Sequence, residues 1–304
     1  MVKAPYKKQV ELLLAVLPEV AREDCFALHG GTAINLFVRD MPRLSVDIDL
    51  TYVPIEDRAT SLTNIANALQ RIKANIEKVI ANARITHRKE EGKLQISANG
   101  VDVKLEVSMV SRGTLTAPVG MVLCNKAQEE FEAFCAVNVV PAGQLYGGKI
   151  CAALDRQHPR DLFDVKYLLQ NEGYSKEVKE GFYFRLLSGE RPINEVLFPN
   201  LLNQRAALDN QFTGMSKENF SYAEFERVRD LLITEIHNNL TEDDKQFILS
   251  FKNGTPNWGI YNFEQFPAIT WKLQNIQRLK ENNADKHMRL YATLEEKLNN
   301  MQRI

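Results

Sequence analysis

Two hydrophobic periods alternate along the first half of the chain. Apolar residues recur at intervals of three and four over residues 7–21 and 57–82, which predicts two amphipathic helices. Short apolar runs or strict alternation predict strands at 25–28, 46–53, 84–88, 93–98, 101–107, 121–124 and 136–140. Asn99-Gly100 separates two of these strands and is typical of a hairpin turn. A short helix is expected after Gly31, with Thr32 able to cap it.

From about residue 142 onward the helical period dominates. It predicts helices at 144–154, 161–170, 175–187, 193–208, 221–238, 241–252, 263–282 and 285–302. A length of 304 residues favours about two domains. We therefore expect an α+β chain with a mixed helix-and-strand domain over 1–140 and a helical domain over 141–304.

Composition narrows the functional classes only slightly. The chain is 44% hydrophobic and 25% charged, which is ordinary globular usage. No apolar run is long enough to cross a membrane, so we expect a cytoplasmic protein without a membrane partner. The formal net charge of −1 does not indicate a nucleic-acid partner. The four cysteines form no C-x-x-C pair, which favours free thiols over a zinc site.

The first candidate for chemistry is the pair Asp47 and Asp49 on a predicted strand. Residues two apart on a strand point to the same face. Two carboxylates on one face repel each other unless a cation lies between them, and oxygen ligands suit Mg²⁺ or Mn²⁺. A D-x-D pair alone is weak evidence, because a solvated strand end or a loop explains most such pairs. The residues around the pair therefore decide between the two interpretations.

A glycine pair precedes these carboxylates. Gly30-Gly31 follows a predicted strand and precedes a helix, a geometry in which backbone N–H groups can approach a phosphate. The alternative is a tight turn that needs a positive φ. Arg43 and Ser45 come just before Asp47, where a metal-held triphosphate would lie.

Glu106 is the third acidic candidate. It lies on the polar side of an alternating strand together with Asp102 and Lys104. A third acidic ligand from a neighbouring strand would complete a two-metal site. Ordinary outward-facing charges on a half-exposed strand explain the same pattern.

A last group of charges spans the predicted helices 144–154 and 161–170. Lys149 and Arg156 are seven residues apart and share a helix face. Arg160, Asp161 and Asp164 begin the next helix, where carboxylates commonly offset the helix dipole. The functional interpretation makes Lys149 a phosphate clamp and one aspartate an orienting group or base.

In their order and spacing, these motifs resemble the AbiEii/AbiGii toxin family of nucleotidyltransferases over about residues 26–170. The matching segments are His29-Gly30-Gly31-Thr32-Ala33, Arg43-Leu44-Ser45-Val46-Asp47-Ile48-Asp49-Leu50, Lys104-Leu105-Glu106-Val107, Lys149 with Ala152, Ala153 and Arg156, and Arg160-Asp161-Leu162-Phe163-Asp164. The block from Gly-Gly to Asp49 is the most specific of them. One departure from the broader superfamily is Gly-Gly-Thr where Gly-Ser is usual.

The resemblance implies a polymerase-β-like mixed sheet with flanking helices, and a site completed by the helical domain. It implies transfer of NMP from an NTP, with Mg²⁺ or Mn²⁺, to an acceptor such as a tRNA 3′ end, within a toxin–antitoxin or abortive-infection system with a cognate antitoxin. It assigns metal binding to Asp47, Asp49 and Glu106, and catalytic roles to Asp47, Asp49, Lys149, Asp161 and Asp164. Nucleotide or phosphate contacts fall to Gly30, Gly31, Thr32, Arg43, Ser45, Arg156 and Arg160.

Two alternatives stay open at the level of sequence. The same fold can modify a small molecule or a protein instead of RNA. The chain can also be a nucleotide-binding module without catalysis. The sequence names neither the NTP nor the acceptor.

Overall fold

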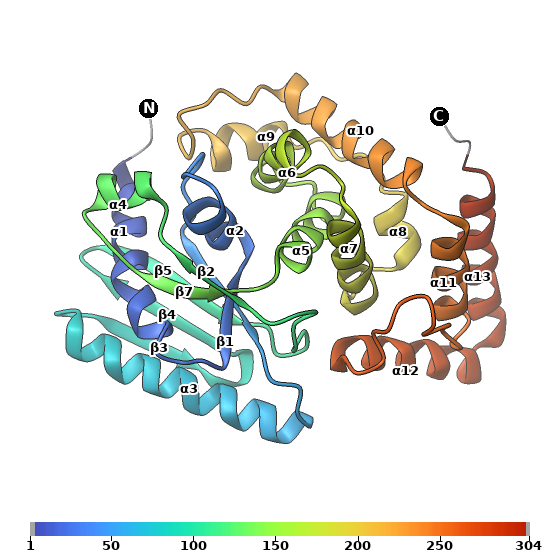
Figure 1. Cartoon of the computed structure of the whole chain (residues 1–304), viewed down its shortest axis with the longest axis horizontal. Helices are drawn as coiled ribbons and strands as arrows, with labels where there is room; N and C mark the ends of the chain where they lie inside the picture. Colours follow the sequence, from blue (N-terminus) through green and yellow to red (C-terminus); the bar gives the residue numbers. More distant parts are fainter. Residues whose placement is uncertain (1–3, 302–304) are drawn as a thin grey trace. The chain divides into compact units, whose positions relative to one another are not determined.

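The structure is a computed structural model that describes residues 4–301 (Figure 1). Its internal contacts divide the chain into two compact units. The first unit contains the described residues up to Leu145 together with Leu208–Asn219, and the second contains Tyr146–Ala207 and the described residues from Phe220 onward. The predicted domain division after residue 140 stays a prediction; the structure adds that Leu208–Asn219 packs with the first unit.

The first unit is built on a mixed seven-stranded sheet with the order β3-β4-β5-β2-β1-β7-β6. Its strands are β1 (Phe26–His29), β2 (Asp47–Tyr52), β3 (Arg84–Arg88), β4 (Lys93–Ala98), β5 (Val101–Val107), β6 (Val119–Val122) and β7 (Ala136–Val139). Strand β2 pairs antiparallel with β1 and parallel with β5, and β1 pairs parallel with β7. The other neighbouring strands pair antiparallel. The predicted α+β class with a mixed sheet is confirmed.

The two faces of this sheet differ in chemistry because the strands alternate. Ile48, Leu50 and Leu105 point to one face and are 0–1% exposed. Helices α1 (Ala4–Val20) and α3 (Arg58–Val79) pack against the sheet and supply its apolar cover (Figure 1). On the other face, Asp47 and Asp49 of β2 and Lys104 and Glu106 of β5 are polar and partly exposed. The polar face is therefore the place where the first unit can present chemistry.

The remaining helical elements of the first unit are short. They are α2 (Gly30–Ala33), the π-helix η1 (Ile34–Val38), the 3-10 turn η2 (Lys89–Glu91), α4 (Asn125–Phe131) and the π-helix η3 (Leu208–Phe212). Helix α2 packs on β1 and β2. It follows β1 without a connecting loop, so the Gly-Gly pair forms both the turn and the first residues of the helix.

The second unit is helical. Its elements are α5 (Ala142–Asp155), which crosses the division, α6 (Pro159–Asn171), α7 (Lys176–Ser188), α8 (Ile193–Leu197), α9 (Arg205–Ala207), α10 (Tyr222–Asn238), α11 (Glu242–Lys252), α12 (Pro267–Asn282) and α13 (Ala284–Asn299). Aromatic rings fill part of its core, as in the pair Phe184 and Phe266, whose centroids are 4.6 Å apart.

Three predicted helices need correction. The single helix predicted over 193–208 is wrong, because α8 ends at Leu197 and helix resumes only at Arg205. Pro199 explains the break, since a proline disfavours helical backbone in the residue before it. The helix predicted from residue 263 begins at Pro267, whose fixed φ suits a first helical turn. The helix predicted to residue 302 ends at Asn299, and residue 302 lies outside the described residues.

Candidate active site

The turn between β1 and α2 brings backbone against a carboxylate. Gly30 has a φ of +74°, in the left-handed region that favours glycine. A Cβ added to Gly30 would lie 2.6 Å from Oδ2 of Asp49, closer than two such atoms can approach. Both the backbone conformation and the space therefore require glycine at this position.

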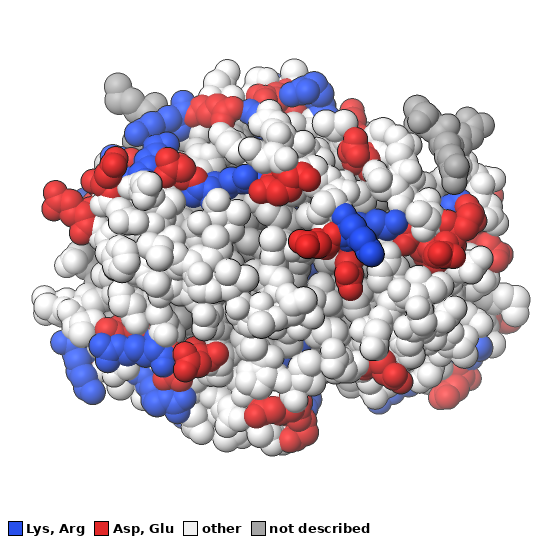
Figure 2. Space-filling view, in the orientation of Figure 1, with Lys and Arg blue, Asp and Glu red and all other residues white. Residues whose placement is uncertain are grey.

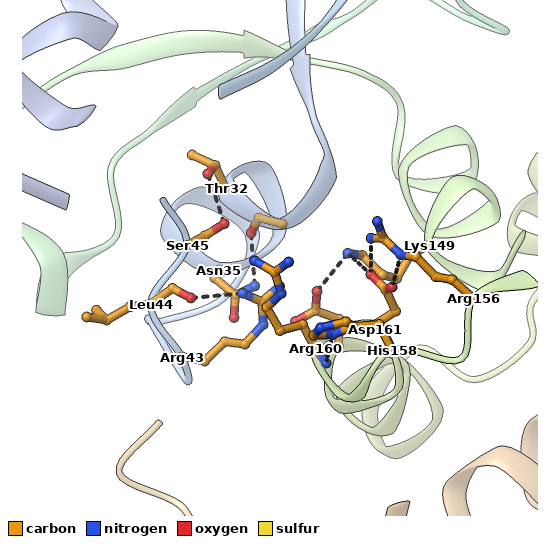
Figure 3. Close-up of polar contacts among 12 residues, drawn as sticks. Thr32, Asn35, Arg43, Leu44, Ser45, Lys149, Arg156, His158, Arg160 and Asp161 are labelled. Carbon is orange, nitrogen blue, oxygen red and sulfur yellow. Dashed lines mark hydrogen bonds and ion pairs between the residues drawn. The ribbon is translucent and has the colours of Figure 1, made fainter. Parts of the chain in front are cut away.

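Thr32 connects the start of α2 to β2. Its side chain is buried, and Oγ1 lies 2.5 Å from the carbonyl oxygen of Asp47 and 3.0 Å from Oγ of Ser45 (Figure 3). Thr32 was predicted to cap the helix, and that prediction is wrong: the helix begins at Gly30, and its N-cap is His29 without a side-chain hydrogen bond. The hydroxyl instead fixes the residues that lead into the carboxylate pair.

Arg43 and Ser45 lie on the irregular segment between η1 and β2 and are 3% and 7% exposed. Arg43 Nη1 donates a hydrogen bond of 2.8 Å to the Leu44 carbonyl. A Cβ added to Gly31 would lie 2.8 Å from Arg43 Nη2 and 2.9 Å from Ser45 Oγ. A guanidinium and a hydroxyl thus lie close against the bare backbone of Gly31. Such a set of donors suits an anion, and a phosphate in particular.

Asp47 and Asp49 share the polar face of β2, as predicted from their spacing. Glu106 lies beside Asp49 on the parallel strand β5. Its carboxylate contacts two lysines, with 3.6 Å from Oε1 to Lys93 Nζ and 3.1 Å from Oε2 to Lys104 Nζ. Within residues 4–301, no group of three or more His, Cys, Asp or Glu side chains is arranged to hold a metal ion.

The two aspartates nevertheless fit a divalent metal by the chemistry of their donors. Mg²⁺ is commonly bound by one or two carboxylates together with substrate phosphates, and Asp47 and Asp49 supply two carboxylates on one face. Glu106 as a third ligand stays a prediction, because its oxygens are engaged by lysines.

A strap, which we define as residues 213–218, holds the segment that carries Arg43. Arg43 and Ser216 form an antiparallel bridge, and the Leu44 N–H donates 2.7 Å to the Met215 carbonyl. The Ser216 hydroxyl donates 2.9 Å to the Pro42 carbonyl. Sequence reasoning missed the strap, because about 170 residues separate the partners and no motif marks it.

The charged residues predicted in the second unit gather around one lysine. Lys149 Nζ, on α5, lies 3.0 Å from Asp161 Oδ1 and 3.0 Å from Asp164 Oδ2, both on α6. Arg156 Nε lies 2.6 Å from Asp161 Oδ2, and its Nη2 lies 3.0 Å from Oδ1 (Figure 3). Arg160 is in the first turn of α6, where its N–H donates 3.1 Å to Nδ1 of the N-cap His158.

Burial makes this ion cluster strong. Lys149 is 7% exposed, and both aspartate side chains are 1% exposed. Burial alone would raise the pKa of Asp161, but the charges and hydrogen bonds of Lys149 and Arg156 outweigh it and hold that pKa well below its usual range. Asp161 is therefore ionised at neutral pH, with both oxygens occupied. Lys149 as a triphosphate clamp stays a prediction, since here it binds the two aspartates.

The predicted site residues thus fall into two groups, each brought together within its own unit. The first unit holds Gly30, Gly31, Thr32, Arg43, Ser45, Asp47, Asp49 and Glu106. The second holds Lys149, Arg156, Arg160, Asp161 and Asp164.

The distribution of surface charge does not indicate a particular substrate. Lys and Arg side chains lie interspersed with Asp and Glu on the face drawn in Figure 2, and neither sign dominates there. This agrees with the net charge of −1. Among the described helices, none combines the length and the apolar character that a membrane span requires.

Comparison with known proteins gives a family match and several solved structures of similar fold. The family described as "Nucleotidyl transferase AbiEii toxin, Type IV TA system" matches residues 11–275. No curated protein sequence matches the chain. Among solved structures, MenT4, a nucleotidyltransferase toxin from Mycobacterium tuberculosis H37Rv, is similar in fold, with a TM-score of 0.58, 12% identity, and coverage of 90% of this chain and 95% of that chain. The family match spans most of the chain, including both groups of site residues, and the chain therefore belongs to the AbiEii family of nucleotidyltransferase toxins of type IV toxin–antitoxin systems.

Proposed function

We propose that the protein transfers a nucleoside monophosphate from an NTP to the 3′ end of an RNA acceptor, with tRNA as the favoured acceptor, and depends on Mg²⁺ or Mn²⁺. The observation that carries the proposal is the convergence of Arg43 and Ser45 on Gly31, directly before the carboxylates of Asp47 and Asp49. Anion-binding donors next to two oxygen ligands are what a metal-bound triphosphate needs.

Each group in the first unit has a separate task. Arg43, Ser45 and the backbone of Gly31 bind and orient the phosphates. Asp47 and Asp49 would hold the metal, which when bound polarises the reacting phosphate and neutralises charge on the leaving pyrophosphate. Thr32 keeps Ser45 and Asp47 in place through its hydroxyl. Catalysis then rests on positioning and electrostatics.

The second unit supplies the group for the acceptor. Asp161 has both oxygens occupied by Lys149 and Arg156. Asp164 contacts the same lysine through Oδ2. We infer that one of these two aspartates orients the acceptor hydroxyl and accepts its proton, with Lys149 holding both carboxylates in place.

The test is incubation of the purified full chain with Mg²⁺, total bacterial RNA and each of the four labelled NTPs in turn. We expect label from one or a few NTPs in the tRNA size range, and none with Asp47→Ala. Asp102→Ala is the matched control, because Asp102 is also a carboxylate on the sheet, and it accepts a hydrogen bond from the hydroxyl of Ser97 on β4. It should label like the wild type.

The size of the labelled product separates the alternatives. Label on a small molecule or a protein would replace the RNA acceptor while keeping the transferase. If no NTP labels any cellular fraction, while an NTP still binds, the protein is a nucleotide-binding module and the proposal is wrong. In the toxin–antitoxin context we also expect growth inhibition by the wild type that Asp47→Ala lacks and a cognate antitoxin relieves.

A further inference from the structure

Two lysines lie on the polar face of the sheet beside the candidate metal ligands. In the parallel register of β2 and β5, Lys104 is the partner of Asp47, and Glu106 is the partner of Asp49. Glu106 in turn faces Lys93 across the antiparallel pair of β4 and β5. Acidic and basic side chains therefore share this face on three adjacent strands.

The contacts among these side chains are specific. Lys104 Nζ lies 3.1 Å from Oε2 of Glu106, and Lys93 Nζ lies 3.6 Å from Oε1. Lys93 also lies 3.2 Å from Oε2 of Glu91, which belongs to the turn η2 just before β4. Lys104 has the different position, next to Asp47 on one side and bonded to Glu106 on the other.

Lys104 is only partly buried. Its side chain is 42% exposed, so it can move without unfolding the sheet. This face carries three negative charges, on Asp47, Asp49 and Glu106. Lys93 and Lys104 offset two of them.

We propose that Lys104 is a built-in counter-cation of this carboxylate group, which keeps a divalent metal weakly bound until the phosphates of the nucleotide arrive with it. A cation next to Asp47 repels an incoming Mg²⁺ or Mn²⁺, and the same cation attracts a metal–NTP complex, whose phosphates carry the excess charge. The proposal rests on the proposed metal role of Asp47 and Asp49. If Lys104 acts in this way, the metal and the nucleotide bind together as one complex.

The experiment measures Mn²⁺ binding to the metal-free, nucleotide-free full chain by the EPR signal of free Mn²⁺. Removing one positive charge near a divalent ion at a partly exposed site is expected to tighten its binding about tenfold. Lys104→Met should show this gain. Lys104→Arg keeps the charge and should bind Mn²⁺ like the wild type.

Two further variants locate the effect. Lys93→Met removes a lysine of the same face that is bonded to Glu91 and Glu106 and is not the register partner of Asp47, so its gain should be clearly smaller. Asp47→Asn combined with Lys104→Met should lose the gain, because the ion would bind at Asp47. Thermal unfolding of each variant confirms that the sheet is intact.

An Mn²⁺ affinity of Lys104→Met within twofold of the wild type, or too weak to measure in both, overturns the counter-cation proposal. An equal gain in Lys93→Met overturns the assignment to Lys104. These outcomes are independent of nucleotidyl transfer. RNA labelling by the wild type with unchanged Mn²⁺ affinity in Lys104→Met refutes this proposal alone, whereas tighter Mn²⁺ binding without labelling of any acceptor refutes the proposed function alone.

Discussion

Replacing Gly30 with alanine separates the two reasons for a glycine in the β1–α2 turn. The φ of +74° costs an alanine about 1–2 kcal/mol relative to glycine. The added Cβ would also lie 2.6 Å from Oδ2 of Asp49, and relieving such overpacking typically costs about 1–3 kcal/mol. We expect Gly30→Ala to lower the free energy of unfolding by roughly 2–5 kcal/mol. Because Asp49 has to move, nucleotidyl transfer should fall further than stability explains.

Two matched variants divide this total. Gly100 has a φ of +77° and no atom within 4 Å of an added Cβ, so Gly100→Ala measures the backbone cost alone. Gly31 has no left-handed φ, and its Cβ would meet Arg43 Nη2 at 2.8 Å and Ser45 Oγ at 2.9 Å. Because Arg43 has a long side chain that can give way, Gly31→Ala should change stability little and raise the KM for NTP.

The assay is urea unfolding of the three variants and the wild type, together with steady-state transfer of labelled NMP. The expected order of destabilisation is Gly30→Ala, then Gly100→Ala, then Gly31→Ala. If Gly30→Ala is no less stable than Gly100→Ala and keeps full activity, the close approach of the turn to Asp49 is wrong. A KM for NTP unaffected by Gly31→Ala would contradict phosphate binding by Arg43, Ser45 and the backbone of Gly31.

Three further predictions concern single contacts. Ser216→Ala removes the hydroxyl bonded to Pro42 and should raise the KM for NTP by roughly three- to tenfold with little change in kcat, whereas Ser216→Thr should restore it. Thr32→Val removes the hydroxyl that donates to the Asp47 carbonyl and should lower the unfolding free energy by about 0.5–1.5 kcal/mol, while Thr32→Ser keeps the hydroxyl and the stability, as urea unfolding will show. The folded-state pKa of Asp161 lies below its usual 3.8, so its contribution to stability is present above that pH and is lost as the pH falls below it. Asp161→Asn should therefore show a shallower loss of unfolding free energy between pH 5 and 3 than the wild type.

The strands of the first unit were the easiest part of the fold to predict. The predicted ranges 84–88, 93–98 and 101–107 are those of β3, β4 and β5. Their alternation is strict because one face packs on α1 and α3 while the other carries charges. Asn99 and Gly100 both have positive φ, as the hairpin turn between β4 and β5 requires.

Long-range pairing could not be predicted in the same way. Nothing in the local pattern around Ser216 indicates a bridge to Arg43, because that bridge depends on how the intervening chain folds. The break after α8 could have been predicted from the sequence, because Pro199 lies inside the predicted helix. The prediction followed the helical periodicity instead, whereas in the structure the helix ends before the proline.

The contacts between Lys149 and the two aspartates of α6 could not be predicted from the sequence. Asp161 and Asp164 are three residues apart and share a face of α6, so two buried carboxylates lie together and require a cation between them. Lys149 meets that requirement at 3.0 Å from each. A triphosphate that drew Lys149 away would leave Asp164 without this contact, and breaking a buried ion pair typically costs about 3–5 kcal/mol. We therefore expect Lys149 to keep both aspartates as its partners when a nucleotide binds. We propose Arg43 as the residue that binds phosphate directly.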